Sequence, residues 1–436
     1  MYDAPGPVPE FDFRPPAEAR LVQASRWPRQ IAYVAEHSAF YRALWRGKTP
    51  PAALDAIAEL PFSDKEMLRT DQAAHGPFGS YLASEPARIN RIHRTSGTTG
   101  VAMNIALSRA DALLTAAVGG RALRASGLGP GHRVVHTLNY QLWMGGLTDH
   151  MNLEATGATV IPYGVGNTDR LIHTIRELGI TAISCTPSYP AVLERVLAEK
   201  FPDAKPRDLG LKLGLFGGEA GLDNLDFRRR LEETWGFKVR NANYGVSDVM
   251  SLFAGQCELS NDLHFMGGDA MFAELVDGDA PLPWADGTTG ELVLTHLSKE
   301  CQPLVRFRSG DVITLTGTGR CACGRWTPRL RVVGRADDMV VVRGLNVFPT
   351  AVAAVVNGFH ELSGEYRIVL PHGGPYDRLP IEAELAEGQS QSQPLAESIE
   401  RAFKSIIGAT AEVTLLTPHS LPRTEGKTRR VFRPKA

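Results

Sequence analysis

The chain has 436 residues but only five cysteines, and its charges almost cancel. So few cysteines, in an odd number, argue against a disulfide framework, and the proline-rich, acidic start at 1–7 is unlike a signal peptide, so we expect a cytoplasmic protein. A formal net charge of −1 gives no electrostatic reason to expect nucleic acid or an acidic membrane as a partner. No apolar run is long enough to span a bilayer, since even 339–348 is interrupted by Arg343 and Asn346.

Two common phosphate-binding motifs are also missing. A Walker loop needs a lysine after its last glycine, but Gly100 is followed by Val-Ala-Met at 101–103, and the dinucleotide fingerprint Gly-x-Gly-x-x-Gly is absent. What is present is Arg-Thr-Ser-Gly-Thr-Thr-Gly at 94–100, between two predicted strands at 87–93 and 103–107. Glycines let the backbone fold tightly, and hydroxyls and amides can surround phosphate oxygens. The stretch therefore predicts a hairpin loop that folds over a triphosphate, although an ordinary turn can have the same composition.

Helix and strand signals alternate regularly from Ser108 to about residue 241. Ser108 begins a capping-box pattern before an Ala- and Leu-rich helix that stops at Gly127, and Thr168 is expected to cap a later helix. Such an order predicts an α/β fold with a parallel sheet and helical crossovers. The predicted strands are 133–138, 159–163, 180–184, 212–216 and 238–241, and the later helices are 168–178, 190–200 and 224–235.

Ligands of parallel α/β sheets gather at the carboxyl ends of the strands. The segments 216–219 and 241–244 lie at two of these predicted ends. They are candidates for ligand contacts, while the alternative interpretation is that their glycines only end strands and begin helices.

After about residue 250 the pattern changes to short strands and turns, with predicted strands at 291–295 and 305–307 and turns at 281–283 and 286–287. A polar elbow at 334–338 precedes what we predict to be a separate small α+β domain. We place the domains at 1–335 and 336–436. Within the second, the predicted strands are 339–342, 365–370, 381–386 and 412–416, and the predicted helices are 349–357 and 396–407.

A metal site is predicted from four softer ligands that fall into two pairs, Cys257 with His264 and Cys321 with Cys323. Gly324 allows the tight turn that a chelating knuckle needs, and three thiolates with one imidazole complete a tetrahedral structural zinc site. The alternative is that these thiols are buried as small hydrophobic groups.

Several segments, taken in order, match a known family. The chain resembles the adenylate-forming (ANL) superfamily, and within it the phenylacetate–CoA ligase family, along nearly its full length. The resemblance implies a large N-terminal domain of helix-flanked β-sheets and a small, mobile α+β C-terminal domain. It also implies that a carboxylate reacts with ATP and Mg²⁺ to give an acyl-adenylate, from which coenzyme A takes the acyl group. The matching segments are 94–100, 140–146, 166–168, 244–248, 290–293, 303–311, 334–349 and 421–431.

The resemblance also implies where the nucleotide lies. The loop residues that would wrap the β- and γ-phosphates of ATP are Thr95, Ser96, Gly97, Thr98, Thr99 and Gly100. A second set, with Tyr244 as a stacking face for adenine, would complete the nucleotide site: Gly217, Gly218, Glu219, Asn243, Tyr244, Gly245 and Ser247.

Charged residues would complete the implied active site. Asp311 would accept both ribose hydroxyls, Arg335 would meet the ribose or a phosphate, and Asp337 would be the hinge between the domains. Lys427 would reach the carboxylate and the bridging α-phosphate oxygen, cancelling charge as the adenylate forms. Asp248 stands where the family usually has Glu and would bind Mg²⁺ with a shorter reach.

The acyl pocket is implied at the segment that contains Tyr140, Trp143, Gly145 and Gly146. Its aromatics offer flat apolar area and its glycines leave space for a ring, so we expect an aromatic acid as the substrate, although such aromatics are also common in a plain core. The leading interpretation is an AMP-forming aryl-acid–CoA ligase, and a homodimer is an expectation from the family alone. One alternative is an adenylating enzyme that passes the activated group to an amine or a carrier protein, or activates nitrite to diazotise an aryl amine. The other is a catalytically silent nucleotide-binding module.

Overall fold

The computed structural model describes residues 2–95, 102–219, 221–343, 345–371, 376–422 and 430–433. These form two compact units, which we describe separately. The first contains the chain up to Gly217 together with 231–309 and 313–332. The second contains the chain from Val333 onward together with two short segments, 218–230 and 310–312.

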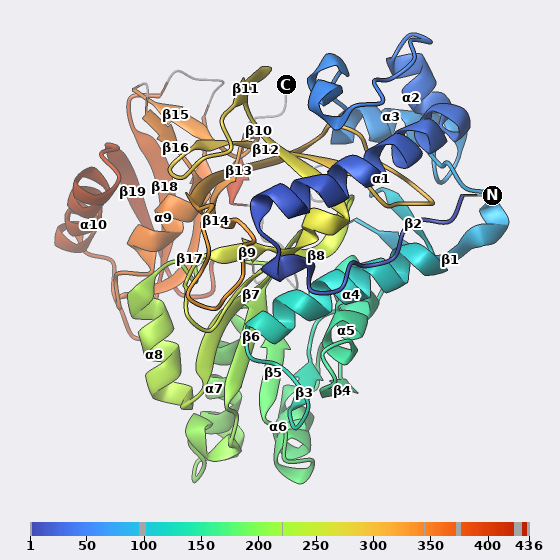
Figure 1. Ribbon diagram of the computed structural model, residues 1–436. Coiled ribbons are helices and arrows are strands. Elements are labelled where there is room, and N and C mark those ends of the chain that lie inside the picture. The colour runs from blue at the N-terminus through green and yellow to red at the C-terminus, as the bar shows by residue number, and fades with distance from the viewer. Residues whose placement is uncertain are drawn as a thin grey trace. The chain divides into compact units, whose positions relative to one another are not determined.

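The helices and strands alternate along the chain and can be followed by their labels in Figure 1. The α-helices are α1 (Pro16–His37), α2 (Ala39–Leu44), α3 (Lys65–His75), α4 (Arg109–Ala125), α5 (Met144–Glu154), α6 (Thr168–Glu177), α7 (Tyr189–Lys200), α8 (Leu225–Trp235), α9 (Pro349–Val356) and α10 (Gln393–Ile406). The strands of the first half are β1 (Ile89–Arg94), β2 (Asn104–Ser108), β3 (Arg133–His136), β4 (Thr159–Pro162), β5 (Ala182–Cys185), β6 (Leu213–Gly217), β7 (Lys238–Val246), β8 (Met250–Gln256), β9 (Leu263–Phe265) and β10 (Met271–Asp277). Those of the second half are β11 (Ala280–Leu282), β12 (Thr289–His296), β13 (Phe307–Gly317), β14 (Arg329–Arg335), β15 (Val340–Val342), β16 (Leu345–Val347), β17 (Leu362–Val369), β18 (Leu379–Leu385), β19 (Ala411–Leu416) and β20 (Val431–Phe432).

The main sheet has twelve strands in the order β11-β10-β12-β13-β14-β9-β8-β7-β6-β5-β3-β4. Its β4-β3-β5-β6-β7 part is parallel, which confirms the predicted α/β organisation. Strands β5 and β6 are buried along their whole length, as expected for parallel strands covered on both faces. From β7 onward the pairings β7–β8, β8–β9, β9–β14, β10–β12 and β10–β11 are antiparallel.

Helices α4 and α5 pack against each other through small residues. A Cβ atom on Gly119 would lie 2.4 Å from the Asn152 side chain, and one on Gly120 would lie 2.8 Å from the Cβ of Ala155. The glycines therefore allow α5 to approach α4 closely. The predicted capping box of α4 is present, with reciprocal hydrogen bonds between Ser108 and Asp111.

Some local predictions were wrong. Asn167, in the left-handed region at φ 49°, is the N-cap of α6, while the hydroxyl of Thr168 lies 3.3 Å from Tyr189 Oη. Strand β7 continues past Asn241 to Val246, because its second half pairs with β8. Strand β13 begins at Phe307, and the segment predicted as a turn at 281–283 supplies most of the short strand β11.

The second unit contains the sheet β19-β18-β17-β20, with α9 and α10 packed on it, and the β15–β16 hairpin. Strands β17 and β18 are antiparallel, while β18–β19 and β17–β20 are parallel. This unit has its own hydrophobic core, in which Phe403 and Ile399 of α10 are fully buried. The predicted combination of a large helix-flanked sheet with a smaller α+β part is confirmed. In the part of the chain that the structure describes, no helix combines the length and the apolar character needed to cross a membrane.

Candidate active site

The base of the predicted phosphate loop is a β-hairpin. Strands β1 and β2 pair antiparallel as predicted, with Arg94 opposite Asn104. Beyond that pair, Thr95 N donates to Met103 O over 2.9 Å, and Met103 N donates to Thr95 Oγ1 over 3.0 Å. The buried Thr95 hydroxyl therefore closes the base of the loop. The other predicted loop residues, 96–100, lie outside the described residues.

The predicted ligand edge of the parallel sheet lies at the point where strand β7 stops pairing with β6. Gly217, the last residue of β6, is opposite Asn243, and a Cβ on Gly217 would lie 2.5 Å from the Asn243 Cβ. One residue later, Tyr244 pairs with Ala254 of β8, and its ring meets Phe253 edge-on at 5.2 Å between centroids. A side chain at position 217 would push β6 and β7 apart, so glycine is required for this close approach.

The end of β7 is equally tight. A Cβ on Gly245 would lie 2.0 Å from the carbonyl oxygen of Ser251, so only glycine fits between β7 and β8 here. Ser247 and Asp248 follow in the turn that joins the two strands. The structure thus brings together, in the first unit, the predicted nucleotide residues Gly217, Asn243, Tyr244 and Gly245.

Sequence reasoning missed the group that holds Asn243. Asn243 Nδ2 donates to Asp149 Oδ2 of α5 over 2.6 Å, and Asn152 Nδ2 donates to Asp149 Oδ1 over 3.1 Å. Burial raises the pKa of Asp149 to about 7, while the hydrogen bonds from Asn243 and Ser251 oppose the rise. An aspartate in a helix is usually solvated, so no sequence signal distinguished it.

Asp248 has an orphaned oxygen that fits a divalent cation. Its side chain is 5% exposed, and Lys65 Nζ of α3 lies 2.9 Å from Oδ2. The buried Oδ1 makes no hydrogen bond within the described residues. Carboxylate oxygens are the ligands that Mg²⁺ prefers, so Asp248 fits the role predicted for it. The Lys65 ammonium partly neutralises the same carboxylate.

In the second unit, Arg335 gathers two predicted site residues. Arg335 Nη1 donates to Asp311 Oδ1 over 3.1 Å, and its Nε and Nη2 donate to the Asp337 oxygens over 2.8 and 3.1 Å. Burial lowers the pKa of Arg335, but the Asp337 hydrogen bonds and the Asp311 charge outweigh it and raise the pKa overall. Gly310, at φ 74°, lets the guanidinium lie close, because a Cβ there would be 2.6 Å from Arg335 Nη2.

Two predicted nucleotide residues, Gly218 and Glu219, are not part of these clusters. Gly218, at φ 81°, and Glu219 belong to the second compact unit and follow β6 directly. Lys427 lies outside the described residues.

The predicted acyl segment is held by two histidines. Tyr140 Oη lies 2.9 Å from His150 Nδ1, and the Tyr140 ring meets His136 edge-on at 5.5 Å. His136 is fully buried, and burial lowers its pKa to about 4. Its Nε2 donates to the carbonyl oxygens of residues 145 and 146, which only accept, over 3.0 and 3.1 Å.

Gly145 and Gly146, predicted to leave space for a ring, are packed closely against the chain itself. A Cβ on Gly145 would lie 2.8 Å from the Trp143 ring, and one on Gly146 would lie 2.4 Å from the carbonyl oxygen of Asn139. The chain itself fills both positions, so these glycines serve the turn into α5.

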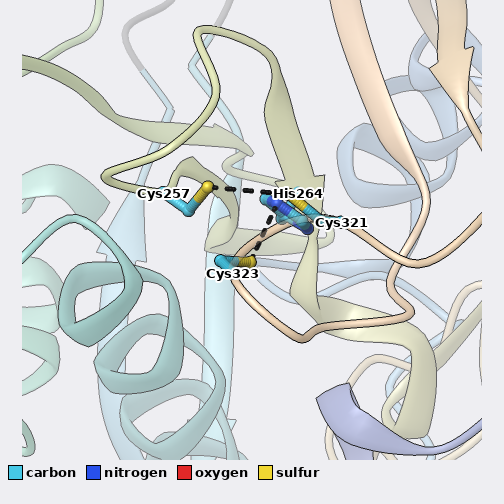
Figure 2. Close-up of side chains that lie close together, drawn as sticks. All are labelled: Cys257, His264, Cys321 and Cys323. Atoms are coloured by element: carbon cyan, nitrogen blue, oxygen red, sulfur yellow. Dashed lines mark hydrogen bonds between the residues drawn. The ribbon is translucent and has the colours of Figure 1, made fainter.

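The four predicted zinc ligands do come together, as Figure 2 shows. Their ligand atoms all lie within 4.8 Å of one another, with Cys257 Sγ 4.0 Å from Cys321 Sγ and Cys323 Sγ 3.7 Å from His264 Nε2. Zn–S bonds of about 2.3 Å in a tetrahedron separate two sulfurs by about 3.8 Å, so the cluster has the right size. His264 Nδ1 lies 2.8 Å from Thr327 Oγ1, an outer contact that orients Nε2 toward the sulfurs.

Comparisons with known proteins agree with this architecture. Residues 47–296 match the AMP-binding enzyme family, and residues 344–435 match the AMP-binding enzyme C-terminal domain. The chain is 34% identical to a phenylacetate-coenzyme A ligase of Thermus thermophilus, over 97% of this chain and 98% of that protein. It is 32% identical to a phenylacetate-coenzyme A ligase of Escherichia coli, over 95% and 94% of the two chains.

A solved structure of 2-hydroxyisobutyryl-CoA ligase, in the postadenylation state with an acyl-AMP, is 29% identical, with a TM-score of 0.86 and coverage of 100% of this chain and 95% of that one. Fold and matches together define an adenylate-forming, AMP-binding enzyme. Within that class, the chain belongs to the phenylacetate–CoA ligase family, as its motifs predicted.

Proposed function

We propose that the protein is an ATP-dependent, AMP-forming ligase that activates an aromatic carboxylic acid as its acyl-adenylate and transfers the acyl group to coenzyme A. The observation that carries this proposal is the similarity to phenylacetate-coenzyme A ligases over 97% of the chain. Three further curated relatives with that name are 30–33% identical over 93–99% of this chain. A solved relative is described with both an acyl-AMP and coenzyme A.

The chemical problem is that a carboxylate anion must attack the α-phosphate of an anionic nucleotide. The enzyme must hold the two in line and supply donors and cations where charge builds up. In the proposed site, Thr95–Gly100 wrap the β- and γ-phosphates, Asn243 and Tyr244 hold the base, and Asp311 accepts the ribose hydroxyls. Lys427 reaches the carboxylate and the bridging α-phosphate oxygen and cancels charge as the adenylate forms.

A domain movement then separates the two half-reactions. The small domain, 336–436, turns about Asp337, withdraws Lys427 and brings the 343–346 segment to the acyl-adenylate. The contact of Asp337 with Arg335 supports this proposal, because it places the proposed hinge beside a residue proposed to meet the nucleotide.

Asp248 would hold Mg²⁺ through its Oδ1, the oxygen that makes no hydrogen bond within the described residues. When bound, Mg²⁺ supplies positive charge to the phosphates. The remaining residues of the site orient the nucleotide and exclude water from the α-phosphate.

The Cys257, His264, Cys321 and Cys323 cluster would bind a structural zinc ion. The ion would pin the loop before β14, which carries Cys321 and Cys323, to β9 and to the residue that follows β8. We expect about one zinc per chain by metal analysis of protein purified without chelator. Less than about half a zinc per chain in such a preparation would refute the site.

Product analysis by mass spectrometry tests the enzyme function. The protein is incubated with ATP, Mg²⁺ and a mixed library of acids, with and without coenzyme A, and in a parallel arm with nitrite and an aryl amine. We expect AMP and an aryl-CoA thioester that forms only with coenzyme A. An acyl-adenylate that never becomes a thioester would point to another acceptor, and the absence of any pyrophosphate exchange would point to a silent binding module.

A further inference from the structure

Asp149 is the most deeply buried carboxylate near the proposed nucleotide site, and the mechanism above does not use it. It lies on α5 and is 4% exposed. Each of its oxygens receives an amide N–H, Oδ2 from Asn243 and Oδ1 from Asn152. The groups that hydrogen-bond to it, Asn243, Asn152 and Ser251, are all uncharged.

The surroundings make this arrangement costly unless both oxygens stay hydrogen-bonded. A small cavity beside Asp149, with room for about one water-sized sphere (about 10 Å³), is lined by five leucines and by smaller or polar residues. An isolated carboxylate in such surroundings is strongly unfavourable. The folded protein should therefore keep both amide donors hydrogen-bonded to Asp149. The lining residues are Leu123, Leu138, Leu153, Ser184, Cys185, Leu215, Gly217, Ala242, Asn243 and Leu252.

The carboxylate settles which way the Asn243 amide points. Above its raised pKa of about 7 the Asp149 carboxylate is ionised and can only accept hydrogen bonds, so the Asn243 atom 2.6 Å from Asp149 Oδ2 is then the NH₂ group. The amide is planar, and its oxygen therefore faces away from that contact. Asn243 Oδ1 makes no hydrogen bond within the described residues, and Asn243 is half-buried. The atom of the Asn243 carboxamide that is left for a ligand is therefore the hydrogen-bond acceptor Oδ1.

We propose that Asp149 is a positioning residue that fixes the Asn243 carboxamide with its oxygen toward the nucleotide, so that the site selects a purine with a 6-amino group over one with a 6-oxo group. This inference rests on the proposed function, in which Asn243 contacts the base. A 6-amino group donates to Asn243 Oδ1. A 6-oxo group presents a second acceptor to the same oxygen, which leaves both without a partner.

Equilibrium binding of ATP and of inosine triphosphate, measured by calorimetry at about pH 8.5, where Asp149 is ionised, and without any acid substrate, tests the proposal. We expect the wild type to bind ATP at least about tenfold more tightly, because a lost hydrogen bond to a polar base costs about 1.4 kcal/mol or more. In Asp149→Asn the amide of Asn243 can turn over, and the preference should fall to about twofold. Asn243→Ala should lose the preference too, and the double variant should lose nothing further.

Thr148→Val is the matched control, since Thr148 is buried on the same helix but hydrogen-bonds His93 instead. It should keep the wild-type preference. A wild-type preference near one, or an unchanged preference in Asp149→Asn, would overturn the inference. If Asp149→Asn does not fold, the wild type measured at about pH 6 tests the same point, because protonated Asp149 no longer fixes the amide and the preference should fall there, whereas an unchanged preference would overturn the inference. Pyrophosphate exchange with ATP, run separately, reports on the proposed function, so a failure of base selection and a failure of catalysis are told apart.

Discussion

Two carboxylate clusters contact proposed nucleotide residues, and they differ in how the negative charge is stabilised. One uses neutral hydrogen-bond donors in a buried place, and the other uses a partly exposed cation. In the first unit, Asp149 is buried and accepts hydrogen bonds from neutral groups. In the second unit, Asp311 and Asp337 share the guanidinium of Arg335, whose side chain is 36% exposed. Buried neutral donors give a fixed geometry, whereas a partly exposed ion pair is screened by solvent and can exchange partners at small cost. The buried cluster suits recognition of a base, and the charged one suits a place where residues must rearrange.

The largest loss of activity is expected for a change at Lys427, the cation that we propose acts on the reacting groups. Lys427→Ala should reduce adenylate formation by about 10²–10³-fold, because an electrostatic donor is lost where negative charge develops. ATP binding should survive. Pyrophosphate exchange measured beside ATP binding checks both, and normal exchange in this variant would remove Lys427 from the proposed mechanism.

Replacing Arg335 should affect the rate of the reaction more than the stability of the protein. We expect Arg335→Ala to lower the rate of adenylate formation by about 10–100-fold, since Asp311 and Asp337 lose a shared partner. The unfolding midpoint should move by less than about 3 °C, because exposed ion pairs contribute about 0–1 kcal/mol. Calorimetric melting beside steady-state kinetics measures the two effects. A large loss of stability with unchanged kinetics would reverse the assignment.

Asp149 should make stability depend on pH. Its folded pKa, raised by burial to about 7, lies above its value of 3.8 in the absence of burial. The folded state therefore binds more protons between about pH 4 and 7, and stability falls as the pH rises through this window. The groups that contact it, Asn152, Asn243 and Ser251, do not titrate, and Tyr140 has a pKa that is raised further above this range.

Because other groups also titrate, the comparison with Asp149→Asn isolates the effect. The wild type should lose about 2–5 °C more than this variant in unfolding midpoint between pH 5 and pH 7.5. Parallel melting curves for the two proteins would contradict a raised pKa at Asp149.

The smallest effect is expected at Lys65. Its ammonium lies 2.9 Å from Asp248 Oδ2 and competes with a metal for the same carboxylate. Lys65→Ala should lower the Mg²⁺ concentration for half-maximal activity by about two- to fivefold, since a partly exposed ion pair of about 0.4–1 kcal/mol is removed. Titration of Mg²⁺ at saturating ATP measures it, with the exposed Lys48→Ala as a control that should not change. A higher Mg²⁺ requirement would mean that Lys65 helps to form the site.

Much of this fold could be predicted because its signals are local. The alternation of strands and helices predicted the parallel half of the sheet, and the capping box of Ser108 and the hairpin around Thr95 were both found. The predicted gathering of the pair Cys257 and His264 with the distant pair Cys321 and Cys323 was also correct, because their side chains are the types that bind metals together.

What could not be predicted depends on contacts between distant segments. Asp149 looks like any polar helix residue until β7 places Asn243 against it. The tail of β7 looks like a loop until β8 pairs with it. The sequence likewise gives no sign that Trp143 and Asn139 pack against the two glycines in the first turn of α5. Burial and partner identity, which sequence patterns do not contain, decide each of these cases.

After Asn243, strand β7 changes from parallel pairing with β6 to antiparallel pairing with β8, and this change has an evolutionary consequence. Strand β7 pairs with the parallel strand β6 in its first half and with the antiparallel strand β8 in its second half. Its register is therefore fixed by both neighbours. Side chains alternate along a strand, and inserting or deleting one residue there would exchange the faces of Asn243 and Tyr244. Descendants of this protein that acquire new acid substrates should therefore vary around 139–143, while the length of β7 stays constant.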